Sequence, residues 1–247
     1  MAERRFGGIE RLYGEAAAAR FASSHVVVVG VGGVGSWAVE ALARSGIGRL
    51  TLIDMDHVAE SNINRQLAAL DSTLGRSKIE VLRARVRDIN PVCEVGCIDD
   101  FVTRENLDSL LPAADWVMDC IDSARVKSAL IAHCRRHAQA VITAGAAGGQ
   151  RDPTRIRVTD LRRTEQDALL ARTRRQLRQQ YGFPSNPKRP FGVPAVWSDE
   201  PVGLPRVCDE PVEGSLNCAG YGACMPVTAG FGLAAAAHVL QQLVPDA

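Results

Sequence analysis

The stretch "HVVVVGVGGVG", residues 25–35, decides the fold of this chain. Its run of valines is typical of a strand that is buried on both faces of a parallel sheet. Gly30, Gly32 and Gly35 then form a G-x-G-x-x-G pattern, with Gly33 inside it. Such glycines permit a tight turn and a close approach of backbone to phosphate, and the N-terminus of the next helix favours an anion. The stretch therefore predicts a strand, a phosphate-binding turn and the start of a helix.

The segments around this stretch alternate between strand-like and helix-like patterns. Predicted strands cover residues 25–29, 49–54, 93–98, 115–120 and 140–145, and predicted helices cover 36–46, 75–91, 104–111 and 124–138. This alternation predicts an α/β fold, a doubly wound and mostly parallel Rossmann-like sheet.

The pattern changes after residue 145. We expect a turn-rich passage with a strand within 145–161, a basic amphipathic helix over 164–182, a proline-rich loop or lid over 183–214 and a closing Gly/Ala-rich helix. The predicted organisation is a helical arm (1–24), a nucleotide-binding domain (25–150) and a C-terminal extension (151–247) that packs on the same domain.

The composition is that of an ordinary soluble protein, with 46% hydrophobic and 23% charged residues among 247. Its net charge of +1 conceals an asymmetry. Residues 151–190 hold eleven Lys/Arg and four Asp/Glu, which gives about +7 there and about −6 elsewhere. This segment indicates either a polyanionic partner or a solvated arginine-rich helix, and composition alone leaves both open.

The seven cysteines include no C-x-x-C pair, so we expect neither structural zinc nor a disulfide framework. The first ten residues lack an apolar signal region, which makes the cytoplasm the expected compartment. Residues 216–244 carry no Asp, Glu, Lys or Arg and are long enough to span a membrane. Their weak Gly/Ala-rich apolarity favours a buried or subunit-contact helix, with membrane association as the alternative.

Polar residues beyond the glycine turn decide which nucleotide is expected. The glycine pattern with Asp54, nineteen residues after Gly35, by itself predicts NAD or FAD more often than another ligand. Hydride transfer, however, needs no second acid and no arginine beside the ribose. Cleavage of a triphosphate uses carboxylates for Mg²⁺ and cations for the phosphates. The chain supplies that set at or beyond the carboxyl ends of its predicted strands, namely Asp56, Asn62, Arg65, Gln66, Lys78, Asp119 and Asp122.

The motifs "GVGGVGSW", "IDMDHVAESNINRQ", "GRSKIEVL" and "DCIDS" resemble the MoeB/ThiF/HesA superfamily of ATP-dependent adenylating enzymes, which are related to ubiquitin activation. The resemblance covers nearly the whole chain. It implies that Asp54 holds the ribose, that Asn62, Arg65 and Lys78 contact the triphosphate, and that Asp122 binds Mg²⁺. It gives Asp56 and Gln66 supporting roles.

Four further segments (5–14, 148–161, 189–200 and 217–232) resemble one branch of the superfamily, the bacterial tRNA threonylcarbamoyladenosine dehydratases. That resemblance implies adenylation and cyclisation of this nucleoside in a tRNA anticodon loop, a homodimer, and in some members a sulfur-relay partner. The alternatives are activation of a ubiquitin-like sulfur carrier, a nicotinamide- or flavin-binding protein, and a non-catalytic relative.

The sequence does not decide which N-terminal arginine reaches the partner subunit's ATP or whether two cysteines are reactive. Relatives often begin "RYxRQ", whose second arginine reaches the partner subunit's ATP; Gly8 stands at that position here, and Arg5 or Arg11 is the candidate replacement. Cys218 and Cys224 lie in a Gly/Ala-rich setting where cysteines are usually inert, and the expected ring closure needs no thiol.

Overall fold

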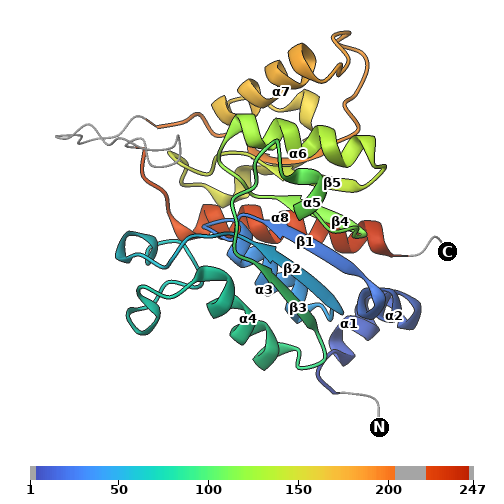
Figure 1. Ribbon diagram of the computed structural model, residues 1–247, viewed down its shortest axis with the longest axis vertical. Helices are drawn as coiled ribbons and strands as arrows, with labels where there is room; N and C mark the ends of the chain where they lie inside the picture. The colour runs from blue at the N-terminus through green and yellow to red at the C-terminus, as the bar shows by residue number, and fades with distance from the viewer. Residues whose placement is uncertain (1–3, 204–220, 245–247) are drawn as a thin grey trace.

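The computed structural model describes residues 4–203 and 221–244, and its centre is a seven-stranded sheet (Figure 1). The strands are β1 (His25–Val29), β2 (Arg49–Ile53), β3 (Glu94–Ile98), β4 (Trp116–Asp119), β5 (Ala140–Ala144), β6 (Ile156–Asp160) and β7 (Pro194–Ser198). Their spatial order is β3-β2-β1-β4-β5-β7-β6, and every pairing is parallel except β6 with β7. The predicted α/β fold with a doubly wound, mostly parallel sheet is confirmed. The order reverses between β1 and β4, which is where such sheets bind ligands.

Helices cover both faces of the sheet. One face carries α2 (Glu15–Ser23), α3 (Gly35–Arg44), α4 (Lys78–Ile89) and α8 (Met225–Leu243), whose buried side chains form one apolar cluster with the strands. The other face carries α5 (Leu107–Leu110), α6 (Ala124–Arg136) and α7 (Ala168–Gln180), with a second cluster. The short α1 (Gly7–Tyr13) precedes α2. Strand β1 contributes valines to both clusters, which explains its unbroken apolar run.

Strand β7 lies in a segment for which the sequence predicts a loop or lid. Its register places Val196 beside Ala144 of β5 and beside Val158 of β6, so this strand links β6 to the rest of the sheet. The prolines around it conceal the strand in the sequence. Pro194 is the first residue of β7, a position where the missing N–H of proline is tolerated.

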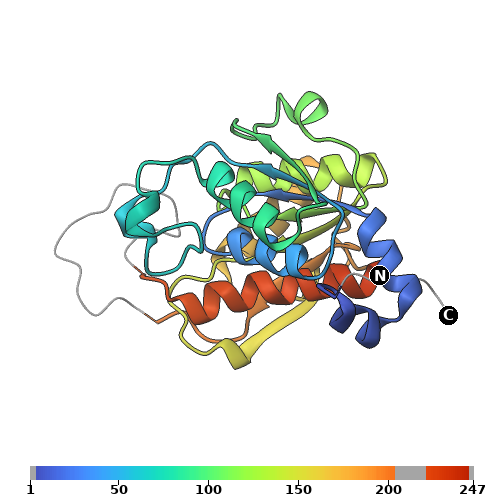
Figure 2. The same ribbon diagram turned by 90° about the horizontal axis from the view of Figure 1, so that it is seen from below.

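Helix α8 accounts for most of the uncharged C-terminal stretch. Figure 2 shows it alongside α3, and the packing is close enough that a Cβ on Gly232 would lie 2.4 Å from the carbonyl oxygen of Val34. The small residues therefore serve close helix packing. Within residues 4–203 and 221–244, no helix has the length and apolarity of a membrane span. Residues 216–220 of the stretch lie outside the described part.

Candidate active site

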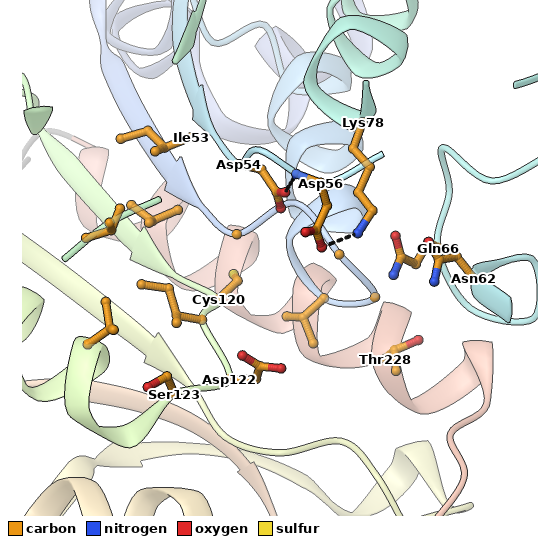
Figure 3. Close-up of a pocket in the computed structure, with 18 of the residues that line it drawn as sticks. Ile53, Asp54, Asp56, Asn62, Gln66, Lys78, Cys120, Asp122, Ser123 and Thr228 are labelled. Carbon is orange, nitrogen blue, oxygen red and sulfur yellow. Dashed lines mark hydrogen bonds and ion pairs between the residues drawn. The ribbon is translucent and has the colours of Figure 1, made fainter. Parts of the chain in front are cut away.

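A cavity of about 460 Å³ opens at the carboxyl ends of β1, β2 and β4 (Figure 3). Its volume is that of a site for a nucleotide-sized ligand. Apart from Gly35 and Asp119, the site residues expected from the sequence line this cavity: Gly30, Gly32, Gly33, Asp54, Asp56, Asn62, Arg65, Gln66, Lys78 and Asp122. Residues that are up to 92 positions apart in the chain are thus brought together at one edge of the sheet.

Two glycines of the turn are required by its backbone. Gly30 has a φ of +82°, and a Cβ there would lie 3.0 Å from the carbonyl oxygen of Cys120. A Cβ on Gly35 would lie 1.9 Å from the carbonyl oxygen of Gly30, so Gly35 shapes the turn without lining the cavity. Helix α3 begins there with Val34 as its N-cap, whose side chain makes no capping bond. The N–H of Ser36 donates to the carbonyl of Gly32 at 3.1 Å, and the N-terminal end of α3, next to Gly33 and Val34 on the cavity wall, favours an anion.

Asp54 fixes the glycine turn to the end of β2. One carboxylate oxygen accepts the backbone N–H of Val31 at 2.7 Å, and the other accepts that of Asp56 at 2.8 Å. Burial raises the pKa of Asp54, and the two N–H donors act in the opposite direction. Each oxygen keeps lone pairs, so the carboxylate can also accept bonds from ribose hydroxyls.

Lys78 and Asp56 form an ion pair beside this carboxylate. The Nζ of Lys78 lies 2.7 Å from a carboxylate oxygen of Asp56, as Figure 3 shows, and the lysine side chain is only 5% exposed. Lys78 is the first residue of α4, which aims its ammonium group into the cavity. An ammonium has three N–H donors, so those beyond the Asp56 bond are available to phosphate oxygens.

The segment between β2 and α4 supplies the remaining polar residues. Asn62 is buried and accepts the backbone N–H of Ala59 at 3.1 Å through its side-chain oxygen. Arg65 donates through Nη1 to the carbonyl of Ser61 at 2.8 Å, which leaves its Nε and Nη2 donors for a ligand. The buried Oε1 of Gln66 has no hydrogen-bond partner among the described residues. A buried acceptor of this kind at a cavity wall is typical of a ligand site.

The two acids at the carboxyl end of β4 have different environments. Asp119 is fully buried: it accepts from Lys127 Nζ at 2.9 Å, from the Thr143 hydroxyl at 2.7 Å and from the backbone N–H of Ile121 at 3.2 Å. It does not line the cavity. Asp122 does, and it makes no hydrogen bond or ion pair with any other described residue. Figure 3 places it across the cavity from Asp56 and Lys78. Of the two acids, only Asp122 is positioned to meet a ligand.

The donor set fits a magnesium ion that arrives with a triphosphate. Mg²⁺ in such sites is held by one or two carboxylates together with phosphate oxygens and water. The unpaired carboxylate of Asp122 on the cavity wall matches that requirement, and the cavity leaves space for the phosphates.

Some cavity residues were not expected from the sequence. Thr228 reaches the site from α8, and Ser123 and Phe101 come from the segments next to β4 and after β3. The position of Thr228 depends on the packing of α8 against α3, for which a single sequence gives no signal. Lys127, the buried partner of Asp119, was also missed, because a lysine in a helix usually faces solvent.

The structure describes three of the four arginines and cysteines whose roles the sequence leaves undecided. Arg5 donates to the carbonyl of Ile89 at 2.7 Å, at the end of α4 that is remote from Lys78 and the cavity. Arg11 is exposed on α1. Cys224 precedes α8 and contacts the carbonyl of Gln150 at 3.6 Å through its sulfur. Cys218 lies outside the described residues.

Comparison with known proteins places this site in a family. Residues 8–246 match the ThiF family. The tRNA threonylcarbamoyladenosine dehydratase of Haemophilus influenzae is 50% identical over 245 residues, which are 98% of this chain and 94% of that protein. Its Escherichia coli counterpart is 49% identical over 253 residues, again 98% of this chain and 94% of that protein.

The solved structures agree. The crystal structure of E. coli tRNA N6-threonylcarbamoyladenosine dehydratase, TcdA, in complex with ATP has a TM-score of 0.89 and 48% identity, with 97% of this chain and 93% of that chain covered. The complex of the same enzyme with AMP has the same TM-score and identity, with 97% and 94% covered. This chain, with its glycine turn and its acids at the carboxyl edge of the sheet, therefore belongs to the ThiF family.

Proposed function

We propose that this protein is an ATP-dependent dehydratase that adenylates and cyclises threonylcarbamoyladenosine in tRNA. One observation carries the proposal: the likeness to the tRNA dehydratases extends over nearly the whole chain and includes a nucleotide-sized cavity lined by acids and cations. The basic segment 151–190, which composition alone assigns either to a polyanionic partner or to a solvated helix, lies within the region aligned with the Haemophilus influenzae dehydratase.

The reaction has two steps. An oxygen of the threonyl carboxylate attacks the α-phosphorus of ATP; a new P–O bond forms, the bond to the bridging oxygen of the β-phosphate breaks, and pyrophosphate leaves. The carbamoyl group of the same nucleoside then attacks the activated carbonyl carbon and loses a proton, and AMP leaves with the former carboxylate oxygen. The nucleoside has lost one water. Ring closure is intramolecular, so its effective concentration is high without an enzyme nucleophile.

The chain's own residues position the nucleotide and offset its charge. The start of α3 receives phosphate at the glycine turn, and Asp54 accepts the ribose hydroxyls. Lys78 and Arg65 stabilise the negative charge that develops on the phosphates as pyrophosphate departs. Asp122 would hold Mg²⁺, which when bound polarises the phosphoryl oxygens. Asp56 keeps Lys78 oriented through their 2.7 Å contact, and Gln66 has a free acceptor for a bound hydroxyl or water.

No thiol is needed for these steps. Burial raises the pKa of Cys120, the cysteine on the cavity wall, to about 12, so it stays a thiol at neutral pH. The sulfur of Cys224 contacts a backbone carbonyl.

A mass assay tests the proposal. The full chain is incubated with ATP, Mg²⁺ and tRNA that carries threonylcarbamoyladenosine, and the nucleosides are then analysed by mass spectrometry. We expect a product lighter by one water, formed only when ATP is present. An unchanged nucleoside mass in the presence of bound ATP contradicts the proposal. ATP–pyrophosphate exchange that requires a protein ending in Gly-Gly would instead identify a sulfur-carrier-activating enzyme.

A group of three arginines beside α7 supports contact with tRNA. This arginine cluster consists of Arg162, Arg174 and Arg178. The guanidinium carbons of Arg162 and Arg178 lie 5.8 Å and 5.4 Å from the ring centre of Phe191, and the buried Nε of Arg178 has no partner among the described residues. Burial, and then the neighbouring Arg178, lower the pKa of Arg174; burial, and then Arg162, lower that of Arg178. Guanidinium groups crowded together in this way suit a phosphate of an RNA backbone, whose negative charge offsets their mutual repulsion.

The position of the cluster fits a substrate that reaches the cavity. Asp167, the N-cap of α7, accepts the backbone N–H of Ala146, whose neighbours Gly145 and Ala147 line the cavity. Arg178 lies eleven residues further, about 16 Å along the helix. An RNA loop seated at the cavity therefore extends naturally over the cluster.

Arg178→Gln tests this contact. We expect the KM for tRNA to rise about tenfold with kcat and ATP affinity unchanged. The magnitude of the slope of the logarithm of the tRNA association constant against the logarithm of salt concentration should fall by about one. The matched control is Arg87→Gln, an exposed arginine on α4 on the other face of the sheet. Equal effects of the two substitutions would exclude a specific role for the cluster.

We also propose that the protein is a homodimer, as the family resemblance implies. Exposed apolar side chains at Ile63 and at Met225 and Leu233 of α8 support this. The side chain of Asn64 donates to the carbonyl of Ala223 at 2.8 Å, so the Ile63 segment lies against the start of α8. Light scattering should give twice the chain mass of 26.5 kDa. Leu233→Arg should halve it, whereas Val92→Arg, at an exposed site away from α8, should not.

A further inference from the structure

Three side chains with metal-binding atoms meet at the end of α6, at the opposite end of that helix from the active site. His133 lies in the last turn of α6, His137 is the C-cap of that helix, and Asp108 reaches them from α5. One ligand atom from each of the three lies within 4.8 Å of the other two. Helix α6 starts directly after Ser123 on the wall of the nucleotide cavity, so the two sites are separated by most of its length.

The distances in this His/His/Asp cluster approach those of a coordination sphere. Metal–ligand bonds of about 2.0–2.1 Å in a tetrahedral site place neighbouring ligand atoms about 3.3 Å apart. Here Asp108 Oδ1 lies 3.1 Å from Nδ1 of His133 and 3.7 Å from Nε2 of His137. Small side-chain rotations would bring all three atoms onto one ion.

The bonding of His133 favours a ligand over a simple ion pair. Its side chain is 5% exposed, and its buried Nδ1 has no hydrogen-bond partner among the described residues although Asp108 Oδ1 is 3.1 Å away. The two atoms are close without being aligned for a hydrogen bond, as expected when both face a common third position. A buried ring nitrogen left in this state needs a partner.

The surroundings admit an ion and the water that would complete its coordination. The cluster borders a hollow of about 630 Å³ that is also lined by Arg136 and Gln139. The carbonyl end of α6 favours a cation, whereas Arg136 opposes one. Asp108 is 79% exposed, so a metal can reach the site from solvent. Two imidazoles and one carboxylate suit Zn²⁺ and similar transition ions better than Mg²⁺ or Ca²⁺.

We propose that His133, His137 and Asp108 bind one divalent transition-metal ion of the zinc type. The ion joins α5 to α6. Helix α5 follows the segment that contains Asp100, Phe101 and Val102 on the nucleotide-cavity wall, so occupancy also restrains that wall. The inference of a metal site does not rest on the proposed tRNA chemistry.

Cobalt titration of the full chain tests the proposal. The protein is first dialysed against a chelator. One equivalent of Co²⁺ should then bind at micromolar concentrations. The bound ion should give visible d–d bands and no thiolate charge-transfer band. Zn²⁺ should displace it and raise the melting midpoint by several degrees. His137→Gln and Asp108→Asn, both at exposed positions, should abolish this binding. His57→Gln, at an exposed histidine elsewhere, should leave it intact.

Three results would overturn the proposal: no binding at micromolar Co²⁺, binding that survives His137→Gln, or a spectrum with thiolate bands, which would assign the ion to cysteines. The Asp108→Asn and His137→Gln variants avoid the buried His133, whose replacement risks misfolding. Circular dichroism establishes that both variants are folded before titration.

Discussion

Asp119 and Asp122 are three residues apart, and the same substitution should affect them in opposite ways. Asp119→Asn removes the carboxylate that lies 2.9 Å from the ammonium of Lys127, where both side chains are fully buried. An asparagine that keeps its oxygen toward Lys127 turns its NH₂ group to the backbone N–H of Ile121, which now donates to Asp119 at 3.2 Å. The variant therefore leaves a buried charge without its counter-ion and one N–H without an acceptor.

The expected cost follows from that geometry. Removing the charge of one partner of a buried ion pair lowers the free energy of unfolding by about 3–5 kcal/mol, because the remaining charge is uncompensated. In a protein of this size each kcal/mol lowers the melting midpoint by about 2–4 °C, so Asp119→Asn should lower it by roughly 6–20 °C. Asp122 makes no bond to the described residues, so Asp122→Asn should change the free energy of unfolding by less than about 0.5 kcal/mol.

Turnover should show the reverse order. Loss of the Asp122 carboxylate removes several kcal/mol of charge stabilisation in the phosphoryl step, so cyclisation should slow by about 100-fold or more. Urea unfolding and the tRNA mass assay, on both variants below their melting midpoints, provide the comparison. A stable but inactive Asp119→Asn together with an unstable Asp122→Asn would refute the division of roles.

Three further outcomes follow from the cavity. Gly35→Ala places a methyl group against the carbonyl of Gly30, so ATP affinity measured by calorimetry should fall at least tenfold, while unchanged affinity would show that the turn adapts. Burial raises the pKa of Asp54, so the folded state holds its proton more tightly than the unfolded chain does, and this group's contribution to stability is lost as the pH rises through the folded pKa. Asp54→Asn should remove that part of the pH dependence in urea unfolding as the pH rises above about 4, and a curve that keeps the wild-type slope would argue against the assignment. Because burial raises the pKa of Cys120 to about 12, Cys120→Ser should retain most of the turnover and iodoacetamide should label Cys120 slowly; rapid labelling would contradict this.

Much of the fold was predictable because local pattern and burial agree. The valines of β1 and the glycines after them specify a strand and a turn, and the helices up to residue 136 follow apolar spacing. Strand β7 was not predictable in this way. Its residues are flanked by prolines, and their pairing with β5 and β6 is set by contacts far away in the sequence.

The site was predictable where its residues follow strand ends. Asp54, Asp56 and Asp122 each come shortly after a strand, so a parallel sheet gathers them at one edge. Asp119 meets the same criterion and is nevertheless buried, because its partner Lys127 becomes visible only when α6 is packed on the sheet. Thr228 reaches the cavity only through the docking of α8.

The late position of β7 has a consequence for synthesis. The 38 residues that separate Asp160, the end of β6, from Ser198, the end of β7, take about 2 to 8 seconds to translate. Until they emerge, β6 has no strand to join, and the outer edge of β5 lies open. The nascent chain thus carries an unpaired strand edge while β1 to β5 are already made, and that interval is when a chaperone or a newly made neighbour has access to it.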